Sequence, residues 1–242
     1  MPLFNSSRSF AIKQKRLFNY LLYALGEIIL VVTGILIALY INNQSELSKK
    51  NRELMNSAKL VYSAMARDTL VIHQFFQESH YRVSQNFLSY LDRPYDSSAV
   101  MGRGGKINMI LFDMYTPGLT NEVEDIVTNA PLNNSALANQ LNAIRRTYTS
   151  NFEIDTEVKN LVFDTSKENL AYLSETQPWY TDFMLDRSCN DDCINFLNNN
   201  VTHKKLATKY YFYYTTLYKS SLQKFKRSII KQMEQLKPLL KA

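Results

Sequence analysis

One apolar run near the N-terminus, from Tyr20 to Ile41, constrains this chain more than any other feature. The run is 22 residues long and carries a single charged side chain, Glu27. About 20 apolar residues in a helix cross the hydrocarbon core of a bilayer. Tyrosines stand near both ends of the run, where membrane helices concentrate aromatic residues. The run therefore predicts a transmembrane helix over residues 20–41.

Two alternatives to a membrane span are weaker. A cleaved signal peptide has a shorter apolar region and ends in a small-x-small site, but Tyr40 occupies the decisive position after Ala38 and Leu39. A core helix of a soluble protein is the second alternative, and the basic, acid-free stretch before the run argues against it. We expect an uncleaved signal anchor.

The charges around the run bear on its orientation. Four basic residues and no acid precede it, and four basic residues mixed with two acids follow it: Arg8, Lys13, Lys15 and Arg16, then Lys49, Lys50, Arg52 and Lys59 with Glu46 and Glu53. The basic counts are equal, but the first set lies closer to the apolar edge. The pattern predicts a basic cytoplasmic N-terminus over 1–19 and an extracytoplasmic domain over 42–242.

One face of the expected span combines a carboxylate with small residues. Glu27, Val31, Gly34 and Ala38 follow one another at spacings of four, three and four, so they share a helix face. Gly34 and Ala38 form a small-xxx-small pair, which allows two helices to approach closely. Either this face contacts another helix, with Glu27 as its polar element, or Glu27 is protonated or reaches the cytoplasmic edge and Gly34 is incidental.

The run YLLYALGEIILVVTGILIALYINN, residues 20–43, resembles the N-terminal signature of an uncharacterised bacterial family of single-pass membrane proteins, the domain of unknown function 6090 type. The sequence departs from that signature at Tyr40 and Gln44, where relatives commonly carry Gln and Trp. The resemblance implies a bacterial inner-membrane protein with a helical periplasmic domain, and it implies no activity. Because Gly26 and Glu27 belong to the signature, the resemblance favours a role for Glu27.

Beyond the run, the sequence predicts long helices. Only six Gly and six Pro occur in 242 residues, and four of the Gly fall between Pro94 and Pro131. Apolar residues recur at spacings of three, four and seven from Leu47 to Leu91 and again from Leu137 to Leu170. Ser135 and Thr202 are candidate N-caps. The prediction is an all-α fold: one transmembrane helix, then an elongated antiparallel helical bundle with one irregular Gly/Pro-containing insertion at 94–119.

No motif for catalysis, cofactors or metals stands out. The glycine loop Gly102–Lys106 lacks the spacing of a phosphate-binding loop. His73 and His80 are seven residues apart, whereas metal-binding helices place ligands three or four apart. No Gly-x-Ser-x-Gly nucleophile motif occurs. We expect no enzymatic activity, no cofactor and no metal.

The two cysteines, Cys189 and Cys193, are a disulfide candidate. In an oxidising compartment a pair four residues apart is most simply explained by a bond between them. A metal site would need two further soft ligands nearby, and the sequence offers none. The pair agrees with an extracytoplasmic domain.

The aromatic run near the C-terminus is a candidate interaction surface. Five consecutive aromatic residues surround a helix, so some of them must face outward, and a basic helix follows in a chain of net charge +6. Contact with a partner protein or lipid headgroups is favoured over stacking on nucleic-acid bases, which the expected compartment disfavours. The candidates for this surface are Tyr210, Tyr211, Tyr213 and Tyr214.

These features lead to two functional hypotheses. The first is a non-enzymatic, membrane-anchored interaction or scaffold protein of the bacterial envelope, which binds another envelope protein or itself and no nucleic acid. The alternative is a ligand-binding, sensor-like helical bundle that signals through a partner, because about 19 cytoplasmic residues are too few for a signalling domain. A polar pocket between helices would favour the alternative, and a flat aromatic patch would favour the first hypothesis.

Overall fold

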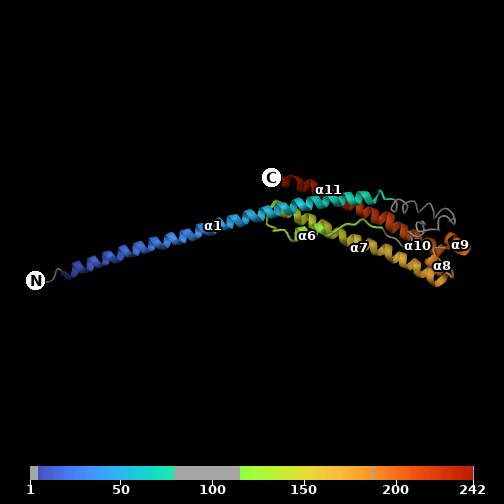
Figure 1. Ribbon diagram of the computed structural model, residues 1–242, viewed down its shortest axis with the longest axis horizontal. Helices are drawn as coiled ribbons and strands as arrows, with labels where there is room; N and C mark the ends of the chain where they lie inside the picture. The colour runs from blue at the N-terminus through green and yellow to red at the C-terminus, as the bar shows by residue number, and fades with distance from the viewer. Residues whose placement is uncertain (1–4, 79–114, 187, 242) are drawn as a thin grey trace. The chain divides into compact units, whose positions relative to one another are not determined.

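The computed structural model describes residues 5–78, 115–186 and 188–241 (Figure 1). In these ranges the regular structure is helical throughout, which confirms the predicted all-α class. The chain divides into two compact units, Met1–Glu53 and Leu54–Ala242. The second unit therefore begins at Leu54, twelve residues after Asn42, where the extracytoplasmic domain was predicted to begin.

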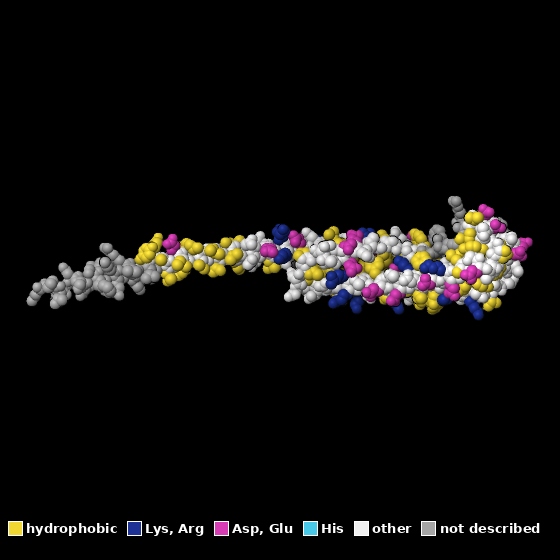
Figure 2. All heavy atoms as spheres, turned by 90° about the horizontal axis from the view of Figure 1, so that it is seen from below, with side chains coloured by type: hydrophobic (Ala, Val, Ile, Leu, Met, Phe, Trp, Pro, Cys, Tyr) yellow, Lys and Arg dark blue, Asp and Glu magenta, His cyan; other side chains and the backbone are white. Residues whose placement is uncertain are grey.

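The first unit is the N-terminal portion of helix α1 (Asn5–Phe75). An 18-residue stretch within the described part of this helix has a mean hydropathy of 2.4 and none of it is buried, so it is long and apolar enough to cross a membrane. Every residue from Leu25 to Glu53 is exposed, and Figure 2 shows hydrophobic side chains along this part of the helix. The Thr33 hydroxyl donates to the Ile29 carbonyl at 2.7 Å, which satisfies it inside an apolar run.

The second unit is a bundle of three long helical segments. They are residues 54–75 of α1, then α7 (Ala136–Thr176), then a continuous run of α10 (Val201–Tyr211), the π-helix η1 (Phe212–Tyr218) and α11 (Lys219–Leu239). Among the described residues, three short helices accompany them: α6 (Glu122–Thr128), α8 (Tyr180–Asp186) and α9 (Asp191–Asn199).

The long segments do not all alternate in direction. Gln140 of α7 donates to Gln232 of α11 at 2.7 Å, and Asn200 before α10 donates to Tyr172 near the end of α7 at 3.0 Å, so these helices are antiparallel. In Figure 1, residues 54–75 and α7 run in the same direction. Helices α10 and α11 therefore run antiparallel to both other long segments, as expected, whereas α7 runs parallel to residues 54–75 of α1.

The core of the bundle follows the helical periodicity of the sequence. Buried positions on α1 are spaced at threes and fours, and they meet matching stripes on α7 and α11. Tyr148 and Phe225 cross edge to face with ring centroids 5.0 Å apart, and Phe75 meets Tyr218 in the same way at 6.3 Å. Aromatic pairs of this geometry contribute about 0.5–1.5 kcal/mol beyond the area they bury.

Side-chain caps begin three of the helices. Ser135 accepts from the Ala138 amide at 3.2 Å, as predicted, and Asn190 accepts from the Cys193 amide at 3.0 Å. The predicted cap at Thr202 is wrong, because Asn200 accepts from the His203 amide at 2.8 Å and Thr202 lies inside the first turn of α10. Asn is a stronger N-cap than Thr, so the helix begins earlier.

The helix predicted to run to Leu91 ends at Phe75. Gln77 donates to the Gln74 carbonyl at 2.8 Å, a tight turn that closes the helix where Phe75 packs against Tyr218. The rest of that prediction, the loop Gly102–Lys106 and most of the expected insertion at 94–119 lie outside the described residues.

Candidate functional site

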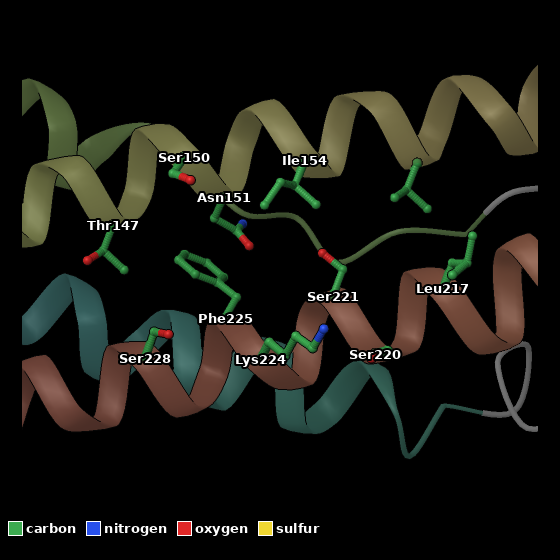
Figure 3. A pocket seen from close by; sticks show the side chains of 11 residues that line it. Thr147, Ser150, Asn151, Ile154, Leu217, Ser220, Ser221, Lys224, Phe225 and Ser228 are labelled. Carbon is green, nitrogen blue, oxygen red and sulfur yellow. The ribbon is translucent and has the colours of Figure 1, made fainter.

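A groove of about 400 Å³ lies between α7 and the η1–α11 segment (Figure 3). Small side chains create it: Ser220, Ser221 and Ser228 occupy positions on α11 where larger residues would pack against α7. Across the groove, Thr147, Ser150 and Ile154 follow one another on α7 at spacings of three and four. The volume falls in the range of small-ligand sites, about 300–1,000 Å³.

The polar groups of the groove are largely unused. Thr147 is engaged: it donates to the Ala143 carbonyl at 3.0 Å and accepts from Gln232 at 3.1 Å. Within the described part of the chain, the other hydroxyls that line the groove make no hydrogen bond: Ser150, Ser220, Ser221 and Ser228. Four hydroxyls facing a common space are therefore free to donate or accept.

Asn151 is the most unusual member of this set. Its side chain is only 7 % exposed and its buried Nδ2 has no hydrogen-bond partner. Figure 3 shows its amide turned toward α11 across the groove. A buried amide without a partner costs about 1–3 kcal/mol, so such a group calls for an explanation. Rotation about the Cβ–Cγ bond would bring the nitrogen to a ligand in the groove.

Of the described residues in the lining of the groove, only Lys224 is charged. Its ammonium group makes no ion pair with any described residue. Helix α11 carries six basic residues and one acid, Glu234. One positive charge, that of Lys224, thus stands among the hydrogen-bonding groups of the lining, an arrangement suited to an anionic ligand.

The π-helix η1 adjoins the groove and contributes Leu217 to it. Such segments are rare and often occur at functional sites. Here the segment is held from inside the bundle, because the Tyr214 hydroxyl donates to the Tyr115 carbonyl at 2.7 Å and the Thr215 hydroxyl donates to the Tyr211 carbonyl at 2.7 Å.

The predicted aromatic interaction surface is wrong for two of its four residues. Tyr210 and Tyr214 are 4 % and 1 % exposed and stack inward with Tyr218, while Tyr211 and Tyr213 are half-buried. Tyr210, Tyr214 and Tyr218 are spaced four residues apart, so they lie close to one face, and that face is the one packed in the core. Phe212 lies on another face and is exposed.

A buried carboxylate lies in the core beside the groove helices. Asp68 accepts a hydrogen bond from the Tyr148 hydroxyl at 2.9 Å, and the Arg67 guanidinium lies 3.9 Å from its other oxygen. Burial raises the pKa of Asp68, against the opposing effects of Tyr148 and Arg67. Burial and the charge of Asp68 raise the pKa of Tyr148. The sequence held a signal for this residue, because Asp68 stands between Met65 and Ile72 on the apolar stripe.

A second buried polar group lies behind the groove. Asp155 forms an ion pair with Lys159 one turn away. Burial raises the pKa of the Tyr218 hydroxyl, and the nearby charge of Asp155 raises it further. The hydroxyl and the Asp155 carboxylate do not form a direct hydrogen bond. These groups face the core and not the groove, so they brace η1 against α7.

His203 forms a third buried polar contact, at the far end of the bundle. It is 2 % exposed, and its Nδ1 lies 3.1 Å from Oδ1 of Asn169. Burial, with a smaller effect from the Lys204 charge, lowers the pKa of His203 to about 4. The imidazole is therefore neutral in the folded protein at neutral pH.

We expect acid to destabilise the bundle through His203. The unfolded pKa is about 6.5, so the unfolded chain binds a proton that the folded chain excludes between about pH 6.5 and 4. Stability should fall as pH falls through this window, by about 3 kcal/mol in total. The raised pKa of Asp68 acts in the opposite direction, so urea unfolding should compare native protein with His203→Gln at each pH. Parallel pH profiles for the two proteins would contradict the assignment.

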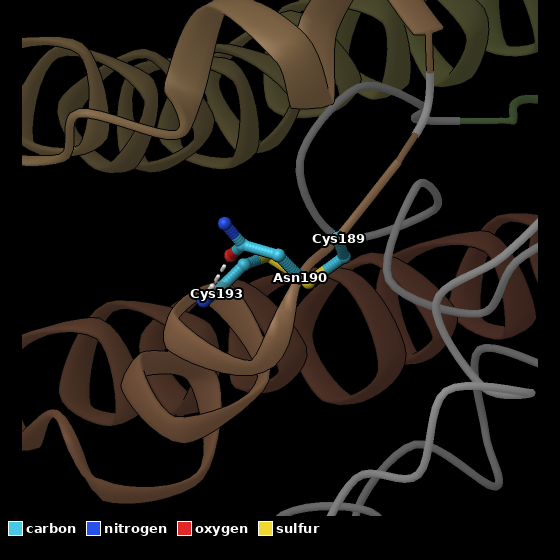
Figure 4. The surroundings of a disulfide bond; sticks show 3 residues. All are labelled: Cys189, Asn190 and Cys193. Atoms are coloured by element: carbon cyan, nitrogen blue, oxygen red, sulfur yellow. Dashed lines mark hydrogen bonds between the residues drawn. A yellow bond between two sulfur atoms is a disulfide. The ribbon is translucent and has the colours of Figure 1, made fainter.

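Cys189 and Cys193 are joined in a disulfide with their Cα atoms 5.2 Å apart (Figure 4). Both are buried, and the cap residue Asn190 lies between them at the start of α9. Among the described residues, no group of three or more His, Cys, Asp or Glu side chains is placed to hold a metal ion.

Breaking this disulfide is expected to have a modest effect. Closing so small a loop restricts the unfolded chain only slightly, so Cys189→Ser with Cys193→Ser should lower the free energy of unfolding by about 2 kcal/mol. Urea unfolding measures that change, and mass spectrometry of the unreduced, alkylated protein checks the bond directly. Two alkylated thiols in freshly purified native protein would contradict it.

Searches of protein-family models, curated proteins and solved structures find no match to this chain.

Proposed function

We propose that this protein is a membrane-anchored, non-enzymatic helical bundle that binds a small ligand in the groove between α7 and α11. The observation that carries the proposal is Asn151, a buried amide without a partner among four unengaged serine hydroxyls. Ligand pockets commonly combine apolar walls with a few placed polar groups, and they form between the helices of bundles. A ligand would satisfy groups that the folded chain leaves unpaired.

The packing of the aromatic run supports this choice over a scaffold built on an aromatic patch. Tyr210 and Tyr214 stabilise the core and are withdrawn from any partner. The groove, by contrast, presents open space and free hydrogen-bonding groups on the same helices. The groove therefore supports the ligand-binding, sensor-like hypothesis, whereas the burial of Tyr210 and Tyr214 weakens the hypothesis of a scaffold with an aromatic surface.

A fragment screen tests the proposal. The full-length protein in phosphatidylcholine nanodiscs would be screened by thermal shift beside Ser221→Trp, whose indole fills the groove, and Ser174→Trp, a control on an exposed face of α7. We expect fragments that stabilise the native protein and Ser174→Trp but not Ser221→Trp. Fragments that stabilise all three proteins equally, or none that stabilise the native one, would refute the groove as a ligand site.

We further propose that residues 20–41 anchor the chain in a bacterial inner membrane, with the N-terminus in the cytoplasm and the bundle in the periplasm. The exposed apolar surface from Leu25 to Ile41 supports the anchor, because such a surface is unfavourable in water. The disulfide supports an oxidising compartment for the bundle. The resemblance of residues 20–43 to the bacterial signature supports the same topology.

A second candidate function, contact with another membrane helix, has its own observation. Glu27, Val31, Gly34 and Ala38 are all exposed on one face of α1, and a Cβ added at Gly34 would meet nothing within 4 Å. A carboxylate in a membrane span usually faces a partner or water. This face would join the protein to another envelope protein or to a second copy.

Cross-linking in intact cells tests this contact. The native protein would be co-purified beside Glu27→Leu and beside Thr33→Leu, which makes a similar polar-to-apolar change on another face of the helix. We expect the cross-linked species to survive in Thr33→Leu and to disappear in Glu27→Leu. The same species recovered from all three proteins would rule out a role for the Glu27 face.

A further inference from the structure

One end of the groove is more polar than the other. Because α7 and α11 run antiparallel, earlier residues of α7 lie opposite later residues of α11. Thr147, Ser150 and Asn151 of α7 stand opposite Lys224 and Ser228 of α11. Leu217 of η1 and Val158 of α7 contribute aliphatic surface toward the other end. Ser220 and Ser221 lie between Leu217 and Lys224, close to Ile154, and Phe225 lies near Asn151 (Figure 3). The groove is therefore more polar toward Thr147 and more aliphatic toward Leu217.

The polar end is suited to a single negative charge. Among the described residues that line the groove, Lys224 is the one charged residue and none is acidic. A cationic ligand would meet like charge, and a doubly charged anion would be only half neutralised. The serine hydroxyls and the Asn151 amide supply the further donors that a carboxylate accepts.

The apolar end is suited to a hydrocarbon body. Ile154 is 47 % exposed, and Val158 and Leu217 are half-buried beside it. Covering these side chains would remove apolar surface from water. A sugar or another uniformly polar ligand would leave that gain unused and would lose hydrogen bonds to water at this end.

We infer that the ligand is an amphiphilic monocarboxylate, with its carboxylate between Lys224, Ser221 and Asn151 and its hydrocarbon part against Ile154, Val158 and Leu217. This inference rests on the proposed ligand-binding function and names the chemical class of the ligand. The carboxylate satisfies the buried amide, and the hydrocarbon covers the exposed aliphatic surface.

Calorimetry on the full-length protein in phosphatidylcholine nanodiscs tests the inference, with empty nanodiscs titrated in parallel. Three matched sets of probes would be used: hexanoate and phenylacetate, their primary amides, and hexylamine with phenethylamine. We expect the carboxylates to bind at least about tenfold more tightly than the amides, because a hydrogen bond to a charged group is stronger than a neutral one. The amines should not bind. Decanoate distinguishes the two possible sources of the ligand. If decanoate binds more tightly than hexanoate, the ligand is a lipid-derived acid. If it binds more weakly, the ligand is a water-soluble acid.

Variants locate the charge. Lys224→Gln removes the charge and keeps a polar side chain one atom shorter, so it should weaken hexanoate binding about tenfold while leaving hexanamide unchanged. Lys231→Gln, on α11 but outside the lining, is the matched control and should change neither. Amides that bind as tightly as carboxylates, in the native protein and in Lys224→Gln alike, would overturn the monocarboxylate while leaving a ligand site. No binding by any probe would overturn the inference and the proposed function together.

Discussion

Replacing Tyr148 with alanine is expected to lower the free energy of unfolding of the bundle by about 3–5 kcal/mol. Tyr148 is 1 % exposed, crosses Phe225 edge to face, and donates the hydrogen bond that Asp68 accepts at 2.9 Å. The substitution therefore opens a cavity and leaves a buried carboxyl group without its donor. Because domains of this size are stable by only about 5–15 kcal/mol, the variant should be close to unfolding.

Two milder variants separate the ring from the hydroxyl. Tyr148→Phe keeps the ring and removes only the donor to Asp68, so it should cost about 1.5–3 kcal/mol. Asp68→Asn keeps an acceptor for Tyr148 and removes the charge whose burial raises the Asp68 pKa, so it should be near neutral at pH 7. Adding Asp68→Asn to Tyr148→Phe should recover part of the loss.

Urea unfolding followed by near-ultraviolet circular dichroism measures these changes, with Tyr62→Phe as a control at a half-buried tyrosine of α1. The cost of Tyr148→Phe should shrink as the pH falls through the raised pKa of Asp68, because a neutral carboxyl depends less on a donor. A cost of Tyr148→Phe no larger than that of Tyr62→Phe, at every pH, would mean that the buried pair does not stabilise the bundle.

The second large effect concerns the apolar run of α1. Arginine near the centre of a membrane helix costs about 2.5–3.5 kcal/mol on the insertion scale. Leu30→Arg with Leu36→Arg should therefore remove the chain from the membrane fraction after extraction with alkaline carbonate. Both residues are more than half exposed, so the substitutions disturb no packing within the unit.

Leu60→Arg with Leu70→Arg is the matched control. These residues are also more than half exposed on α1, but they lie beyond the apolar run, so the protein should stay in the membrane fraction. If both pairs of substitutions release the protein, or neither does, residues 20–41 are not what holds it in the membrane.

The all-α class could be predicted because it follows from features that are local in sequence. The scarcity of Gly and Pro and the periodicity from Leu47 onward predict long helices. Ser135 and the acids at the start of α6 mark helix beginnings by mechanisms confined to one turn. The direction of α7 relative to α1 could not be predicted in this way, because it depends on how a long connecting segment returns.

The groove could not be predicted because it forms where small side chains of α11 pack against α7, and the two helices are far apart in the sequence. Ser220, Ser221 and Ser228 are ordinary surface residues in a sequence, and they become a site only when Asn151 stands opposite them. The burial of Tyr210 and Tyr214 was missed for a related reason. Five consecutive aromatic residues surround a helix axis, and which of them face the core depends on the helices packed against them.

Photo-cross-linking tests the central claim, that the groove between α7 and α11 is the binding site, most directly. A diazirine-bearing hexanoate would be irradiated with the full-length protein in nanodiscs, and adducts would be mapped by mass spectrometry. We expect adducts confined to peptides containing residues 147–158 and 217–228, suppressed by unlabelled hexanoate and absent in Ser221→Trp. Adducts in the apolar run at 20–41, or adducts that persist in Ser221→Trp, would contradict it.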